Sequence, residues 1–312
     1  MTDIEAVPAR PENEADHLAL HDDDPFWSES YYLDFFDVDR GVGGYVRLAF
    51  LPNLGRCWYW ACLVGPDRPL VTVIDHDVPL PAGSSREIRS EGLWADYTVE
   101  SPLDHVTVGV EAFAVALDDP AETYGDLRGE RVPFGLDLEW ETDGGTYAYP
   151  GGVTRYEVPC RVHGEVLVGQ EKIELDGWGQ RDHSWGNRDW WALGWSWTAG
   201  RLDDGTRFHG TSVDLGGAHI FGTGYVQPPG EAMMATDQAR YVPVLGDHGL
   251  PTTCDYRLGD LDMRIDPVAF SPVRLVAPDG RVSLFPRAWT TFTLADGRTG
   301  QGWTEWNQPQ PT

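Results

Sequence analysis

Short segments in which apolar and polar residues alternate recur along most of this 312-residue chain. Their apolar positions are rich in Val, Trp, Tyr and Phe, and several segments are joined by Asp-Gly pairs, at 143–144, 204–205, 279–280 and 296–297. Asp and Gly tolerate the positive φ of tight turns, so such a pair between alternating segments predicts a β-hairpin. No segment shows a sustained helical period with caps. The pattern therefore predicts an all-β protein with little helix.

The number of hairpins favours barrels or sandwiches, and a closed barrel leaves no exposed sheet edge. A Trp-rich strand lies early in each half of the chain, at 58–63 and at 191–199. The length suits one large domain or two ordinary ones. We expect an acidic N-terminal tail over 1–24 that is disordered or loosely draped, a first β-domain over 25–169 and a second over 170–312.

The charge balance excludes several classes of partner. The chain has 50 acidic and 23 basic side chains and a formal net charge of −27, so nucleic acid and anionic membrane surfaces would repel it. Lys172 is the only lysine, which argues against Schiff-base chemistry. The four cysteines lack zinc-site spacing, no apolar run approaches the roughly 20 residues of a membrane span, and no signal peptide is visible. We expect a cytoplasmic monomer or homodimer without a metal.

The densest group of chemically informative residues lies at 177–191, Gly-Trp-Gly-Gln-Arg-Asp-His-Ser-Trp-Gly-Asn-Arg-Asp-Trp-Trp. Tryptophan is large and mostly apolar, and charges beside it have to be paired or solvated. A segment that mixes both so densely fits neither plain core nor plain surface, and indicates the wall of a site. Its candidate ligand-binding residues are Trp178, Arg181, Trp185, Arg188, Trp190 and Trp191.

The alternation that follows predicts an aromatic wall. The residues that share one face of the expected strand are Trp191, Leu193, Trp195 and Trp197. A half-buried strand with a large core face explains this pattern too, and is commoner. Three tryptophans in register nevertheless suit the lining of an apolar ligand cavity. His209 and Tyr225 either reach the same cavity from across this strand or are buried wall residues.

The core of the segment, Asp182-His183-Ser184-Trp185-Gly186, resembles the Asp-His-x-Trp-Gly motif of the carotenoid hydratase (hydroxyneurosporene synthase) and AttH-like proteins. Similar segments at 43–48, 162–165 and 300–305 extend the resemblance over most of residues 25–306. It implies two packed lipocalin-like β-barrels, the second carrying the motif, with a large apolar cavity. It also implies an enzyme that hydrates, dehydrates or cyclises a C=C bond of an isoprenoid, terpenoid or polyene-like molecule without a cofactor.

The residues allow such chemistry. Adding water to an unactivated alkene requires a dry proton donor and a surface that stabilises a carbocation, and a carboxylic acid in apolar surroundings beside aromatic faces supplies both. Asp182 is the candidate acid and His183 its orienting partner. Strand alternation puts these two on opposite faces unless the backbone turns near Gly186. Glu305, flanked by two tryptophans, is either a second catalytic carboxylate or an edge-strand charge.

Two other interpretations of the motif stay open. In one, its charged residues form a buried group of ion pairs that braces the two domains. In the other, the protein is a lipocalin-like carrier that binds an apolar ligand without changing it. A carrier needs shape and apolar walls, whereas a catalyst needs an acid within reach of the ligand. The favoured function is an enzyme acting on a small hydrophobic substrate.

Overall fold

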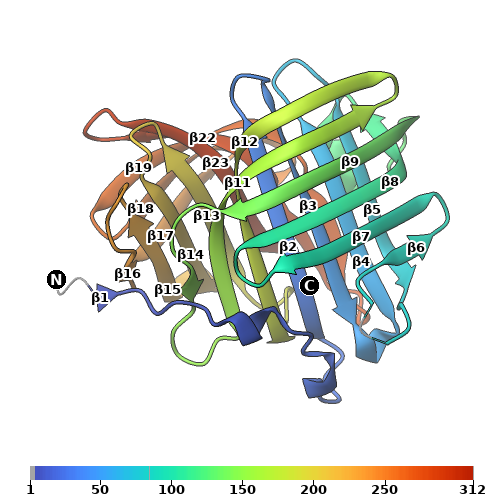
Figure 1. The fold of residues 1–312 in the computed structure, drawn as a ribbon, viewed down its shortest axis with the longest axis horizontal. Coiled ribbons are helices and arrows are strands. Elements are labelled where there is room, and N and C mark those ends of the chain that lie inside the picture. The colour runs from blue at the N-terminus through green and yellow to red at the C-terminus, as the bar shows by residue number, and fades with distance from the viewer. Residues whose placement is uncertain (1–3, 84, 312) are drawn as a thin grey trace.

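The structure is a computed structural model that describes residues 4–83 and 85–311. Most of these residues lie in strands, which form two large sheets side by side (Figure 1). The all-β fold predicted from the hairpin pattern is therefore confirmed. The short 3-10 segments are η1 (Pro11–Glu14), η2 (Leu18–Leu20), η3 (Pro52–Leu54), η4 (Pro120–Tyr124) and η5 (Asp247–Gly249). A search of the described residues for a helix with the length and apolar character of a membrane span found none.

The first sheet closes on itself as a barrel. Neighbouring strands pair antiparallel in the order β12-β2-β3-β4-β5-β8-β9-β11, and β11 pairs again with β12. The bounds are β2 (Trp27–Asp37), β3 (Val42–Leu51), β4 (Arg56–Val64), β5 (Leu70–Pro79), β6 (Ile88–Ser90), β7 (Leu93–Ser101), β8 (His105–Leu117), β9 (Glu130–Thr142), β10 (Tyr147–Ala148), β11 (Arg155–Val168) and β12 (Glu171–Asn187).

The second sheet runs in the order β1-β16-β15-β14-β13-β23-β22-β19-β18-β17. Its ends approach each other, because β17 contacts both β14 and β15. Strands β20 and β21 form a hairpin attached to β23. The bounds are β1 (Ile4–Glu5), β13 (Gly194–Leu202), β14 (Arg207–Leu215), β15 (Ala218–Gln227), β16 (Met234–Thr236), β17 (Ala239–Leu245), β18 (Pro251–Leu258), β19 (Leu261–Phe270), β20 (Val273–Val276), β21 (Val282–Phe285), β22 (Arg287–Leu294) and β23 (Thr299–Pro309).

The boundary between the sheets lies between Asn187 and Gly194, later than the expected division at residue 170. β12 pairs with β11 on one side and β2 on the other, so the strand that carries the Asp182 motif closes the first barrel. The structure thus corrects the expectation that the motif belongs to the second domain. The turn at Gly169 reverses the chain inside one sheet and does not separate two domains.

The apolar core has one layer inside each barrel and one between the barrels. On β2, Tyr31 and Phe35 pack inside the first barrel, whereas Tyr32 and Phe36 pack against residues of the second sheet. Both faces of this strand are therefore buried along its whole length. Hydrogen bonds cross the same interface: the Trp303 indole donates to the carbonyl oxygen of Phe35 at 2.9 Å. The interface between the barrels is therefore packed like a protein interior.

The N-terminal segment corrects another expectation, because it is anchored to both sheets at defined points, although most of its described residues are exposed. β1 pairs with β16 in the second sheet, and the chain then runs along the lower side of both barrels in Figure 1. Glu14 is buried and forms a 2.6 Å ion pair with Arg181 of β12. These contacts join residues more than a hundred positions apart, so no local pattern announces them.

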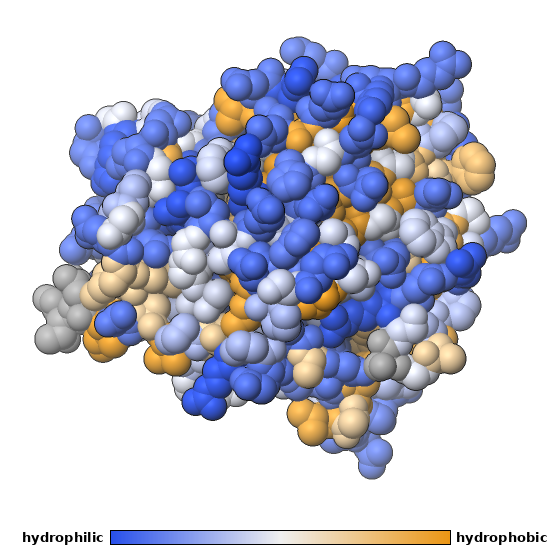
Figure 2. All heavy atoms as spheres, in the orientation of Figure 1, coloured by the Kyte–Doolittle hydropathy of each residue, from blue (hydrophilic) through white to orange (hydrophobic). Residues whose placement is uncertain are grey.

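The outer surface suits the large negative charge. The face shown in Figure 2 is mainly hydrophilic, with apolar residues in separate small patches. The four cysteines, Cys57, Cys62, Cys160 and Cys254, are all buried and free. The large apolar side chains are concentrated inside the barrels and between them.

Candidate functional site

A cavity of about 260 Å³ lies where the two barrels meet. Its walls come from β2, β3, β11 and β12 of the first barrel, from β13, β14, β15, β21 and β23 of the second, and from the connecting segment 188–193. Neither barrel alone would enclose it. Clefts at the interface between domains are common ligand sites, so the cavity is the first candidate for function.

One side of the cavity is aromatic. Trp190 and Trp195 meet edge to face with ring centroids 4.9 Å apart, and both rings contact Phe285, at 5.4 and 5.7 Å. Trp197 also lines the cavity, and its indole donates to Glu157 at 3.0 Å. Aromatic faces offer both apolar area and a negative potential that attracts cations.

Asp182 enters the cavity from β12. It lies opposite Tyr32 on β2 and opposite Glu157 on β11, and Arg155 donates to it at 2.6 Å. Its side chain is 4% exposed. Burial raises the pKa of Asp182 above the usual carboxyl range; Arg155 opposes the rise, but the nearby carboxylates Glu157 and Glu305 add to it. Asp182 therefore retains its proton at a pH where an exposed carboxyl group has lost it.

Glu157 has the opposite electrostatic character. It is fully buried behind the cavity wall and accepts hydrogen bonds from Arg155, Trp197 and Gln180, at 2.7, 3.0 and 3.1 Å. Burial opposes its charge, but Arg155 and His209 outweigh this and lower the pKa of Glu157. Arg155 thus lies between a carboxylate that keeps its charge and Asp182, which keeps its proton. Two neighbouring carboxyl groups with opposed pKa shifts are typical of an acid site.

Glu305 reaches the cavity from β23 and forms an ion pair with the fully buried Arg287. The guanidinium of Arg287 lies over the rings of Tyr45 and Tyr32, with its central carbon 3.6 and 4.7 Å from the ring centroids. Glu305 is therefore not an edge-strand charge: β23 pairs with β13 on one side and β22 on the other, and the carboxylate is paired with Arg287. Its role in catalysis stays a prediction.

Two further arginines line the cavity. Arg47 comes from β3 and Arg188 from the connecting segment that follows β12. Burial lowers the pKa of Arg47 to about 9 and that of Arg188 to about 10, so both remain charged at neutral pH. Arg188 donates to the carbonyl oxygen of Thr154 at 3.2 Å. The polar side of the cavity is therefore rich in arginine.

The structure does not bring His183 to Asp182. β12 continues without a turn through residues 180–185, so the two side chains point to opposite faces. His183 lies inside the first barrel, stacked on Tyr31 at 4.2 Å, and Arg181 and Trp185 share that face. The expected pairing of Asp182 with His183 is corrected: Arg155, not His183, contacts the acid. The expected positions of Arg181 and Trp185 at the ligand are corrected for the same reason.

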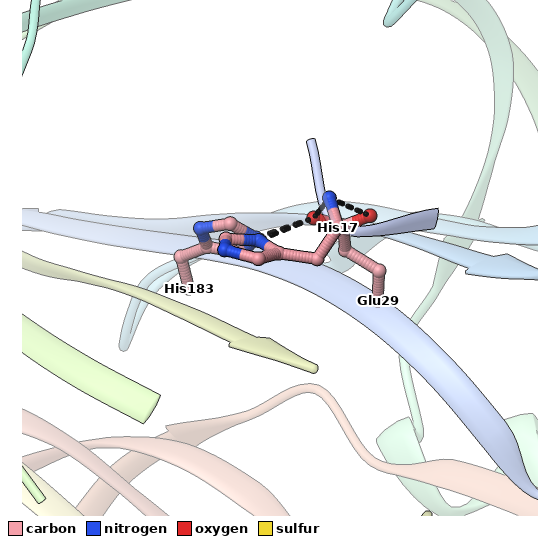
Figure 3. Close-up of side chains that lie close together, drawn as sticks. All are labelled: His17, Glu29 and His183. Carbon is pink, nitrogen blue, oxygen red and sulfur yellow. Dashed lines mark hydrogen bonds and ion pairs between the residues drawn. The ribbon is translucent and has the colours of Figure 1, made fainter. Parts of the chain in front are cut away.

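His183, Glu29 and His17 form a compact group, shown in Figure 3, with one ligand-type atom of each within 4.8 Å of the others. Glu29 lies 2.9 Å from Nε2 of His183 and 3.2 Å from Nδ1 of His17. Nδ1 of His183 lies 2.9 Å from the carbonyl oxygen of Asn13, to which it can only donate. Among the described residues this group has the spacing of a metal site. Its contacts also tie Asn13 and His17 of the N-terminal segment to β12 and β2. We interpret it as a hydrogen-bonded anchor for the N-terminal segment.

The remaining predicted residues divide by position. Those that line the cavity are Asp182, Arg188, Trp190, Trp195, Trp197 and Glu305. His209 and Tyr225 are buried behind its wall, where they bond to Tyr149 and Gln180. Trp178 lies elsewhere, under Arg201. Trp191 precedes β13, which begins only at Gly194, and packs against Phe26 and Trp58. The expected strand face of Trp191, Leu193, Trp195 and Trp197 is therefore shorter than predicted, because only Trp195 and Trp197 lie in β13.

Sequence reasoning missed Arg47, Arg155, Tyr32 and Tyr149 as cavity residues. A signal was present for one of them. The β11–β12 hairpin pairs Val168 with Glu171, and counting back along it places Arg155 opposite Ser184 and Glu157 opposite Asp182. Tyr32 and Arg47 come from strands distant in sequence, and Tyr149 from the loop between β10 and β11. Only the three-dimensional arrangement reveals these three.

Comparison with solved structures supports the fold. An AttH-like protein from Nitrosomonas europaea aligns with a TM-score of 0.66 at 16% identity, covering 97% of this chain and 98% of that one. Kievitone hydratase from Nectria haematococca aligns with a TM-score of 0.60 at 11% identity, covering 90% and 88%. CghA in complex with Sch210972 gives 0.57 at 10% identity, covering 92% and 89%. These likenesses confirm the shared lipocalin-like two-barrel fold.

Comparison with curated proteins gave no match. The scan against protein families matched residues 10–310 to a domain of unknown function, DUF7064. The match spans both barrels, the connecting segment and every residue that lines the cavity. The chain therefore belongs to the DUF7064 family.

Proposed function

We propose that the protein is an enzyme of the hydratase or cyclase type that acts on a hydrophobic terpenoid or polyene-like molecule in the inter-barrel cavity. The observation that carries the proposal is Asp182: a buried carboxyl group with a raised pKa that faces an aromatic cavity. A carrier needs the aromatic wall but has no use for a protonated acid. Kievitone hydratase and CghA share the fold, which supports this class of activity.

The proposed reaction begins with proton transfer. Asp182 donates its proton to one carbon of a C=C bond, which forms a C–H bond and leaves a carbocation on the other carbon. Arg155, 2.6 Å away, stabilises the carboxylate that results. Trp190, Trp195 and Trp197 stabilise the cation through their ring faces.

The cation then has two fates. In hydration, a water molecule adds to it, and the proton that this water loses returns to Asp182. In isomerisation, a C–H bond beside the cation gives up its proton to the Asp182 carboxylate, and the electron pair of that bond forms a new C=C bond. In cyclisation, a second double bond first attacks the cation, which forms a C–C bond and a new cation, and a C–H bond beside this new cation then gives up its proton to Asp182 in the same way. Each route restores the protonated acid, and each uses only residues of this chain and water.

The cavity volume bears on the substrate. Its 260 Å³ lies just below the range of about 300–1,000 Å³ for small-molecule sites. This size favours a short terpenoid over a long carotenoid. The four buried, free thiols support a cytoplasmic location.

The test is Asp182→Asn, which keeps the size of the side chain and its hydrogen-bonding reach but removes the transferable proton. We expect turnover to fall by about 10²–10⁴. Gas chromatography with mass spectrometry of geraniol, farnesol and geranylgeraniol reactions would measure it, through the added mass of water or through isomers with a changed retention time. Asp176→Asn is the matched control, because Asp176 lies on the same strand but is exposed and pairs with Arg161.

The pH profile supplies a second readout. Because the acid has to be protonated, turnover should fall as pH rises through the raised pKa of Asp182. An Asp182→Asn protein with full activity would remove Asp182 as the acid, and Glu305 would be the next candidate. Binding without turnover in the wild-type protein would favour the carrier.

A further inference from the structure

Arg47 is a buried cation that forms no ion pair with a carboxylate among residues 4–83 and 85–311. Its side chain lies in the cavity wall, the residue is 4% exposed, and its Nη1 has no hydrogen-bond partner in the described part of the chain. The guanidinium is held between two indole rings, 4.4 Å from the Trp60 centroid and 4.8 Å from that of Trp190. These ring contacts hold the guanidinium in place, but they do not accept a hydrogen bond from its Nη1. A buried charge in this state favours binding of a counter-ion.

Arg188 is in a similar position on the same cavity. The Arg188 side chain donates to the carbonyl oxygen of Thr154, and Arg188 forms no ion pair among residues 4–83 and 85–311. The other arginines of the site differ in this respect. Arg155 is paired with Asp182 and Glu157, and Arg287 is paired with Glu305. Asp189 also lines the cavity, but its partner is Arg281. Among the described residues, each acidic side chain of the cavity therefore has an arginine partner, whereas Arg47 and Arg188 have no ion pair.

The strand order places this positive region at a defined distance from the acid. Arg47 on β3 lies opposite Tyr32 on β2, and Tyr32 lies opposite Asp182 on β12. Arg47 and Asp182 are thus two strand spacings apart, which is roughly 10 Å between their backbone positions. The aromatic side of the cavity adjoins Arg47 through Trp190. One ligand could therefore contact the arginine, the aromatic wall and the acid at the same time.

We propose that Arg47 and Arg188 form an anion subsite, so that the substrate is amphiphilic: an apolar, unsaturated chain with an anionic oxygen head group, a carboxylate or a phosphate. Arginine suits both groups because its donors bind two oxygens at once. The head group would sit on the arginines and the double bond several carbons away, beside Asp182. This inference rests on the proposed function of the cavity and specifies its substrate class.

The test compares ligands that differ in charge but not in chain: farnesoic acid, its methyl ester and farnesyl phosphate. Tryptophan fluorescence of the full-length protein reports binding. We expect at least one of the two anions to bind about tenfold or more tightly than the ester. Whichever anion shows this advantage identifies the head group. If neither the acid nor the phosphate binds more tightly than the ester, the anion subsite is wrong, and the proposed function is unaffected.

The variant test uses Arg47→Met and Arg188→Met, which keep much of the apolar stem and remove the charge. The anion should lose its advantage in these proteins, while the affinity for the methyl ester stays the same. Arg47→Lys should keep part of the anion's advantage in affinity. Arg161→Met, on the exposed face of β11, is the control. If neither the anions nor the ester bind the wild-type protein, both the subsite and the proposed function are wrong. The ester comparison needs no variant, so it remains decisive if a variant fails to fold.

Discussion

The two faces of β12 carry polar groups of the same kinds in different settings. On one face, Asp182 borders a cavity and keeps its proton. On the other, Arg181 and His183 lie inside the first barrel, where they bind Glu14 and Glu29. The inner face is filled by the protein itself, whereas the outer face leaves room for a ligand. Along this part of β12, residues packed inside the barrel therefore alternate with residues that face the cavity.

The largest effect on stability should come from the inner face. Glu14→Gln removes the charge that pairs with the buried Arg181 at 2.6 Å, and leaving a buried charge without its partner costs about 3–5 kcal/mol. Thermal or denaturant unfolding would measure the loss, with Glu12→Gln, an exposed position of the same segment, as control. Asp182→Asn should cost less than about 1 kcal/mol, since the buried Arg155 retains Glu157. Equal destabilisation by the two variants would abolish the contrast between the faces.

The second largest effect should be a loss of folding stability at low pH, caused by Glu29, the partner of His183. Burial opposes the charge of Glu29, but hydrogen bonds from His17 and His183 lower its pKa from 4.5 to about 2. Because the folded pKa lies below the unfolded one, the stabilisation is fully present above pH 4.5 and is lost as pH falls toward 2. The difference corresponds to about 3 kcal/mol. Urea unfolding between pH 6 and 2 would show it, and Glu29→Gln should flatten this part of the curve.

The smallest effect concerns the aromatic wall. Trp195→Ala removes a ring that lines the cavity, so binding of farnesol or its derivatives should weaken by about 1 kcal/mol. Trp58→Ala removes a ring of the inter-barrel core that does not line this cavity, and should lower stability without changing affinity. Fluorescence titration of both variants separates the two roles. Equal loss of affinity in both would place the ligand elsewhere.

The sequence was sufficient for the fold class and for part of the site. Alternation and Asp-Gly turns report local geometry, which is why the strands, Asp182, Trp195 and Trp197 could be predicted. Alternation also separated Asp182 from His183, and the structure agrees with that simple rule rather than with their adjacency in the motif. Local patterns fail where distant segments meet. Arg47 and Glu14 acquired their roles through such contacts, and no periodicity in their own neighbourhoods records them.

The strand order also sets the sequence of events on the ribosome. The first barrel cannot close until β12 has emerged to pair with β2, and β1 has to wait for its partner β16. The cavity is completed later still, because Glu305 and the pairing of β13 depend on β23, at the end of the chain. A nascent chain therefore makes the barrel that holds Asp182 well before the walls that enclose it. The acid is shielded from water only after β23 has emerged and paired.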